Sequence, residues 1–170
     1  ANTVGMKNLG LGFESLRSNV DGNDNYGIGY QALLSNISGS RNLAIGALAL
    51  ENNTTGDDNL ALGSDALEKN SSGSRNTVLA PFSFTLYNNL DGYDNCAIGY
   101  VAMEDPVSSY QTLALGYSAL RNLTTGLGNT AAGSVALRDL MTGENNTAFG
   151  HASLLYITGG SRNTAFGAQS

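Results

Sequence analysis

The residue types that most often carry chemistry are scarce in this chain. His151 is the only histidine and Cys96 is the only cysteine. A histidine that acts as a general base needs a nearby group to orient its ring, and no acidic residue occurs between positions 146 and 162. With one histidine and one cysteine, neither a three-histidine zinc site nor a cluster of cysteine ligands can form. We therefore expect no catalytic residue, no metal site, no cofactor and no enzymatic activity.

Acidic turns are the next candidates, because carboxylate oxygens are ligands for Ca²⁺. They contain Asp21 and Asp24, Asp57 and Asp58, and Asp91 and Asp94. The equivalent turns elsewhere carry Arg41, Arg75 and Arg162, and the Gly-Gly-x-Gly-x-Asp pattern of calcium-binding β-rolls is absent. We expect solvated turns in which Asp and Arg pair across neighbouring units, with calcium binding as the alternative.

Aromatic residues cluster in one irregular stretch, which contains Phe82, Phe84, Tyr87 and Tyr93. Aromatic rings with amides and carboxylates beside them can stack on sugars and hydrogen-bond their hydroxyl groups. These four residues are therefore the candidate contacts for a receptor or glycan. The alternative is that the stretch is a tolerated bulge, with Phe82 and Phe84 as local filler. Tyr30, Tyr100 and Tyr117 share another repeat position and form a second rank of candidates.

Charge and hydropathy exclude two classes of partner. The 170 residues carry a net charge of −6, and only 13% of them are charged. No positive excess is available to neutralise phosphates, so neither nucleic acid nor an anionic membrane surface is an expected partner. The longest apolar run, residues 44–50, is interrupted by Gly46 and is too short to insert across a bilayer.

An internal repeat organises the whole chain. The pattern Asn-x-Ala-(Ile/Leu/Phe)-Gly-x-x-Ala-Leu recurs every 17 residues, with one interval of 19. Its first positions are Asn8, Asn25, Asn42, Asn59, Asn76, Asn95, Thr112, Asn129, Asn146 and Asn163. We call these residues the anchors and count repeat positions from them. The repeat predicts one domain over residues 1–170, with an irregular unit at 76–94 that contains the insertion.

A unit of 17 residues is too short for a pair of helices and carries two glycines that would break a helix. Two short apolar segments separated by Gly and Asn turns are typical of a β-solenoid. The sequence therefore predicts an all-β, parallel solenoid of about ten coils with two short strands per coil. Its length would be roughly 47 Å at one strand spacing per coil.

The apolar columns of the repeat predict self-association. Large apolar residues fill the fourth position in nearly every unit, and Leu, Met or Phe84 fills the ninth, so both columns are expected to be buried. The third position is small and apolar throughout. Because neighbouring strand residues face opposite sides, each strand is apolar on both faces and a single coil stack encloses only one. We expect the small third-position column to face outward and another copy of the chain to cover it. The alternative is that exposed alanines are tolerated without a cover.

The repeat resembles the head repeats of trimeric autotransporter adhesins (YadA-like heads) and the Asn-Thr-Ala-(Ile/Val)-Gly repeats of phage tail fibres and bacterial surface proteins. Residues 42–50 and 129–137 match the second pattern closely, although the adhesin-head repeat proper is shorter. The resemblance implies a left-handed β-roll in a side-by-side homotrimer. It implies an extracellular segment of a longer fibre, on a virion or a bacterial surface, that contacts a host glycan or protein.

Two other functions remain open at this level. Ile-Gly-x-x-Ala-Leu also resembles the hexapeptide of acyltransferases with a left-handed β-helix, which would make the chain a single-chain solenoid enzyme or ligand-binding module. Those coils need three such hexads, whereas each unit here has one. The third reading is a purely architectural spacer without a receptor.

Overall fold

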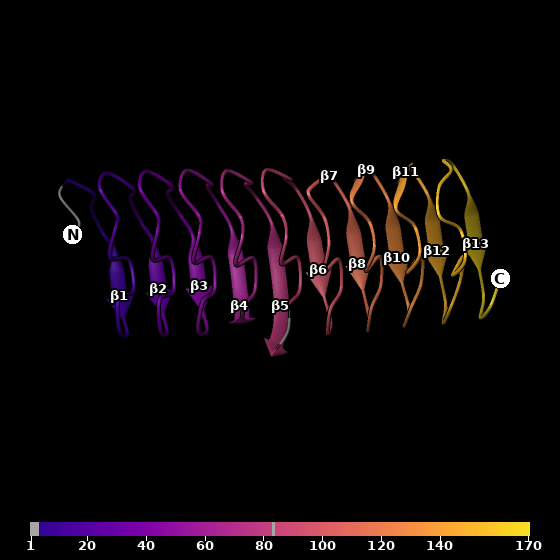
Figure 1. Cartoon of the computed structure of the whole chain (residues 1–170), viewed down its shortest axis with the longest axis horizontal. Helices are drawn as coiled ribbons and strands as arrows, with labels where there is room; N and C mark the ends of the chain where they lie inside the picture. The colour runs from indigo at the N-terminus through magenta and orange to yellow at the C-terminus, as the bar shows by residue number, and fades with distance from the viewer. Residues whose placement is uncertain (1–3, 83) are drawn as a thin grey trace.

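The chain is wound into a stack of coils that forms an elongated rod (Figure 1). The computed structural model describes residues 4–82 and 84–170, without the side chains at positions 81 and 82. The strands in this part of the chain are β1 (Leu9–Leu11), β2 (Tyr26–Ile28), β3 (Leu43–Ile45), β4 (Leu60–Ser64), β5 (Thr77–Phe82), β6 (Cys96–Ile98), β7 (Ser108–Tyr110), β8 (Leu113–Leu115), β9 (Thr125–Leu127), β10 (Thr130–Ala132), β11 (Thr142–Glu144), β12 (Thr147–Phe149) and β13 (Thr164–Phe166). No helix occurs among the described residues, so none is available to span a membrane.

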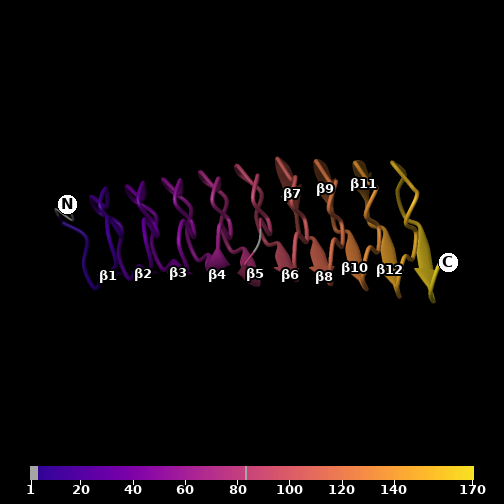
Figure 2. The ribbon, with the colours of Figure 1, turned by 60° about the horizontal axis from the view of Figure 1, so that its bottom comes forward.

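Two parallel sheets run along the rod on different sides of the coils (Figure 2). The larger has 10 strands in the order β1-β2-β3-β4-β5-β6-β8-β10-β12-β13, and the smaller has 3 in the order β11-β9-β7. Each strand pairs with its counterpart one repeat away, as Ala44 does with Ala61. The all-β parallel solenoid is confirmed, with about 9 turns and a spacing near 17 residues.

The core contains the small third-position column and the ninth-position leucines, but not the large fourth-position column. Ala44, Ala61 and Leu50 are fully buried, whereas Ile45 remains 39% exposed. The expectation that both large columns are buried and that the small column faces outward was therefore wrong. The coil is thin, and alanine on the strand leaves room for the leucine that enters from the opposite side. The fourth-position side chain then points outward because strand residues alternate.

The ninth-position leucines adopt a left-handed backbone conformation. Leu33, Leu50 and Leu67 have φ angles of 55°, 53° and 54° and are fully buried. That conformation costs a leucine about 1–2 kcal/mol, which the burial of its side chain, about 1.5–3 kcal/mol, offsets. The second apolar segment of each unit is therefore a tight turn that aims its leucine inward, and not the second strand that the sequence predicted.

The second strand occurs elsewhere in the unit, as β7, β9 and β11, directly before the anchors. In earlier coils, side-chain oxygens replace the strand ladder at this place. The amide of Ser40 donates to Asp57 Oδ1 at 2.7 Å, and the amide of Asp57 donates to Ser74 Oγ at 3.0 Å. Tyr110 and Leu127 occupy the same repeat position and carry no oxygen close enough to the backbone to do this. Main-chain pairing replaces the side-chain bonds there.

Anchor asparagines form a buried ladder along the rod. The Asn42 side chain donates to Gly56 O at 2.8 Å and to Asn25 Oδ1 at 3.1 Å. Its own Oδ1 accepts from the amide of Asn59 at 3.0 Å and from Asn59 Nδ2 at 3.1 Å. The ladder satisfies backbone groups at a turn that would otherwise be buried without partners.

A second asparagine ladder occupies the twelfth repeat position and ends midway along the rod. Asn53 Nδ2 donates to Asn36 Oδ1 at 2.8 Å, and the same pattern continues to Asn89. In the next coil Pro106 takes this place, so Asn89 Oδ1 is buried without a hydrogen-bond partner. Leu123 and Leu140 then fill the column. The interior therefore changes from polar to apolar at the level where the small sheet begins.

Candidate functional site

The two-residue insertion lengthens β5 and moves Phe84 out of the core. β5 runs from Thr77 to Phe82, and its register against β4 shifts between Leu62 and Ser64. After the insertion Leu86 fills the buried leucine column, while Phe84 is 44% exposed. Phe84 was expected in the buried ninth-position column, which was wrong because the extra residues precede it. The side chain of the candidate Phe82 lies outside the described residues.

Phe84 and Tyr87 form an aromatic pair at the surface. Their ring centroids are 4.9 Å apart with the rings nearly perpendicular, at 84°. Lys69 Nζ lies 4.6 Å from the Tyr87 centroid, and the Tyr87 hydroxyl donates to Glu68 Oε1 at 3.2 Å. Burial raises the pKa of Glu68, with the Tyr87 hydrogen bond acting in the opposite direction. Burial and the Glu68 charge raise the pKa of Tyr87. The cluster holds one exposed ring edge beside a carboxylate and an ammonium group.

Tyr93 belongs to a different cluster. Its ring centroid lies 4.7 Å from that of Tyr110 at an angle of 43°, and the Arg75 guanidinium lies 5.4 Å from its centroid. Among the described side chains, no ring contact joins this pair to Phe84 and Tyr87. Tyr93 therefore does not form one continuous platform with Phe84 and Tyr87.

The charged turns form ion pairs between neighbouring coils. Arg41 binds Asp58 through two hydrogen bonds of 2.6 and 2.7 Å, and Arg75 binds Asp94 in the same way at 2.6 and 3.1 Å. These hydrogen bonds lower the pKa of Asp58 and of Asp94. Within the described residues, no group of three or more His, Cys, Asp or Glu side chains is placed to hold a metal ion. The expected pairing of Asp with Arg across neighbouring units is confirmed.

An apolar strip runs along the outer face of the ten-stranded sheet. We define it as the second- and fourth-position side chains of that sheet. Its apolar members are Leu9, Leu11, Tyr26, Ile28, Leu43, Ile45, Leu60, Leu62, Leu79, Cys96, Ile98, Leu113, Leu115, Ala132, Phe149 and Phe166. They are all at least partly exposed. Towards the C-terminal coils, Thr130, Thr147 and Thr164 take the second position, so the strip is most apolar from β1 to β8.

Aromatic pairs border the strip at the sixth repeat position. Tyr100 and Tyr117 stack with centroids 5.9 Å apart, and Phe13 and Tyr30 stack at 5.7 Å. All four rings are more than half exposed. Cys96, inside the strip, is a free thiol whose pKa is raised by burial. The strip and its borders therefore form a long apolar and aromatic face that the single chain leaves uncovered.

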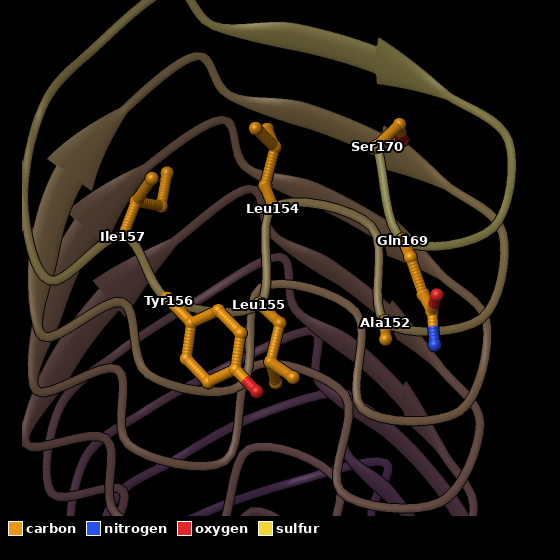
Figure 3. A pocket seen from close by; sticks show the side chains of 7 residues that line it. All are labelled: Ala152, Leu154, Leu155, Tyr156, Ile157, Gln169 and Ser170. Carbon is orange, nitrogen blue, oxygen red and sulfur yellow. The ribbon is translucent and has the colours of Figure 1, made fainter.

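A hollow of 530 Å³ lies at the last coils and is lined by Ala152, Leu154, Leu155, Tyr156, Ile157, Gln169 and Ser170 (Figure 3). Leu154 and Ile157 point into the coil and pack against the core, continuing the buried columns of earlier coils. His151, the one histidine, is exposed nearby in sequence. The polar side chains in its lining are those of Tyr156, Gln169 and Ser170.

The chain was compared with protein-family models, curated proteins and solved structures, and none of the three comparisons gives a match. The case for function therefore rests on the repeat and on the surfaces described above.

Proposed function

We propose that this chain is a non-enzymatic segment of a trimeric extracellular fibre, on a phage tail or a bacterial surface, that projects toward a host surface. The observation that carries the proposal is the apolar strip on the outer face of the ten-stranded sheet. A parallel sheet with apolar side chains on both faces is normally covered on both. A second copy of the same chain offers the same strip, in the same register, as a partner surface.

The size of the strip supports association. Ten strands at about 4.8 Å make it about 43 Å long, and two side-chain columns make it about 10 Å wide. The area is thus about 400 Å², within the range of the largest apolar patch on a monomer, which is often functional. The stacked aromatic pairs on its border enlarge the face toward the roughly 800 Å² that each partner buries in a stable complex. The number of chains, three, comes from the resemblance to adhesin and tail-fibre repeats.

A contact role at the tip or side of such a fibre is supported by the pair Phe84 and Tyr87. An exposed ring with a carboxylate and an ammonium group beside it suits a sugar, whose ring face is apolar and whose edge is polar. The pair lies on a turn of a rigid scaffold, where binding residues are commonly found. This observation favours a fibre that contacts its target over a bare spacer.

The mass of the native chain in solution tests the association. We expect light scattering to give a mass near three chains, and the assembly to resist detergent until it is boiled. Ile45→Asp, inside the strip, should lower the mass toward that of one chain because it places a charge in the shared face. Ile37→Asp is the matched control, since Ile37 is 47% exposed but lies outside the strip. A native chain that stays monomeric at micromolar concentration refutes the proposal.

Cys96 provides an independent readout, because it is the only thiol and lies within the strip. Alkylation of Cys96 at one fixed pH should be slow in the native assembly and faster in Ile45→Asp. Equal rates in the native chain, Ile45→Asp and Ile37→Asp would show that nothing covers the strip.

A further inference from the structure

The outer face of the three-stranded sheet carries a second surface feature, on a different side of the coils from the apolar strip (Figure 2). A groove of 610 Å³ follows β7, β9 and β11. Its floor and walls include Ser108, Tyr110, Thr125, Leu127, Thr142 and Glu144. The groove follows the three-stranded sheet, and among the described residues strands are assigned at this side of the coils only in β7, β9 and β11.

Two threonine hydroxyl groups in the groove are free. Thr125 and Thr142 are paired in register on adjacent strands, and both are exposed. Within the described residues, neither side chain makes a hydrogen bond to the protein. They occupy the fourteenth repeat position, whereas the side chains that bind backbone amides of the preceding coil, those of Asp57 and Ser74, occupy the sixteenth. The groove hydroxyls therefore retain their full hydrogen-bonding capacity for a ligand.

One wall of the groove changes from aromatic to apolar to acidic along the rod. Tyr93 and Tyr110 form a tilted ring pair at one end, Leu127 is paired in register with Tyr110, and Glu144 is paired with Leu127. The Glu144 side chain is exposed and makes no ion pair within the described part of the chain. Its backbone amide donates to Ser161 Oγ at 3.0 Å, and its carbonyl oxygen accepts from the Arg162 amide at 2.9 Å. The wall thus offers a ring face, an aliphatic surface and a free carboxylate in succession.

We propose that this groove binds a neutral linear oligosaccharide that lies along the rod axis. Tyr110 and Leu127 would cover the apolar C–H faces of the sugars, while Thr125, Thr142 and Glu144 hydrogen-bond their hydroxyl groups. Neighbouring coils are about 4.8 Å apart, close to the length of one pyranose ring in an extended chain, so each coil meets about one sugar.

Charge selects against acidic glycans. Glu144 lies in the groove, Ser108 Oγ at its edge donates to Asp91 Oδ1 at 2.6 Å, and the chain carries a net charge of −6. A carboxylated or sulfated sugar would be repelled by these groups. The inference deepens the contact role of the proposed fibre and rests on it for its biological setting. Binding itself can be measured whether or not the chains associate.

The test is titration calorimetry of the native chain with three neutral hexasaccharides: cellohexaose, chitohexaose and maltohexaose. The variant Thr125→Val/Thr142→Val removes both hydroxyl groups and keeps the side-chain shape and the preference for strands. Thr55→Val is the matched control, because Thr55 is an exposed threonine at the same repeat position outside the groove. Circular dichroism verifies that each variant is folded.

We expect at least one hexasaccharide to bind to the native chain. The double variant should bind it about tenfold more weakly, because two hydrogen bonds are lost. Thr55→Val should bind it as the native chain does. Hyaluronan, a linear acidic glycan, should bind less well than the neutral sugars. No binding of any of the three at millimolar concentration, or equal binding by the double variant and the native chain, overturns the proposal. Either result leaves the mass measurement of the proposed fibre unaffected.

Discussion

The anchor ladder makes a quantitative prediction for Asn42→Ala. The Asn42 side chain makes four hydrogen bonds, two as donor and two as acceptor. Three of the four partner groups keep another bond after the substitution. Gly56 O still accepts from Asn53 Nδ2 at 3.0 Å, Asn25 Oδ1 still accepts from the backbone amide of residue 42 at 3.0 Å, and Asn59 Nδ2 still donates to Gly73 O at 2.8 Å. The backbone amide of Asn59 alone loses its acceptor.

The expected loss of stability follows from this distinction. A buried amide without an acceptor costs about 1–3 kcal/mol, and each of the other three lost bonds about 0.5 kcal/mol, the low end of the range for groups that keep a partner. The sum predicts that Asn42→Ala lowers the free energy of unfolding by about 2.5–4.5 kcal/mol. For a chain of this size that is a fall in Tm of about 10 °C.

Urea unfolding followed by circular dichroism measures the difference, at one chain concentration because association would shift the apparent stability. Hydrogen exchange of the Asn59 amide gives a local readout and should become fast. Asn52→Ala is the control, since Asn52 is exposed and its side chain donates only to Glu68 O, at 3.2 Å, which the Asn52 backbone amide also contacts. If Asn42→Ala costs no more than Asn52→Ala, the ladder does not stabilise the rod in the way described.

Three further predictions concern other parts of the unit. Gly46→Ala should lower the free energy of unfolding by about 3 kcal/mol or more, because φ is 139° and the new Cβ would lie 2.4 Å from a carbonyl oxygen of the next coil. Gly159→Ala is the control in the same urea assay. Its new Cβ has its nearest atom at 3.6 Å, so the free energy of unfolding should change by about 0.5 kcal/mol or less. Asp58→Asn should cause a small loss that disappears in 1 M salt, because Arg41 and Asp58 pair at an exposed turn; a loss that persists in salt would contradict a screened surface pair. The raised pKa of Glu68 means that the folded chain holds this proton more tightly, so its contribution to stability falls as the pH rises through the range just above the ordinary value of 4.5. Glu68→Gln should therefore gain stability relative to the native chain over that range, and parallel pH profiles of the two would disprove the assignment.

The candidate contacts were only partly predictable, because an insertion changes the register downstream of it. Counting in steps of 17 places Phe84 in the leucine column, but the chain absorbs its extra residues in β5 and Leu86 fills that column. No pattern in a single sequence says where within a coil an insertion is absorbed. The sequence does carry a signal for the groove. Two residues before successive anchors, Tyr93, Tyr110 and Leu127 stand where the earlier units have Asn, Ser or Asp.

The sequence by itself determined the solenoid, its repeat length and its turns. A pattern kept in phase along the chain forces equivalent residues to stack, and glycine and asparagine mark places where the backbone turns tightly. Only the tertiary structure decided which face of each strand is inside. Both faces are apolar, so alternation alone cannot choose between them. Side-chain volume decides which face is inside. Ala44 is small enough to leave room in the coil for the buried Leu50, which enters from the opposite turn. Ile45 is then left on the surface, where another chain can cover it.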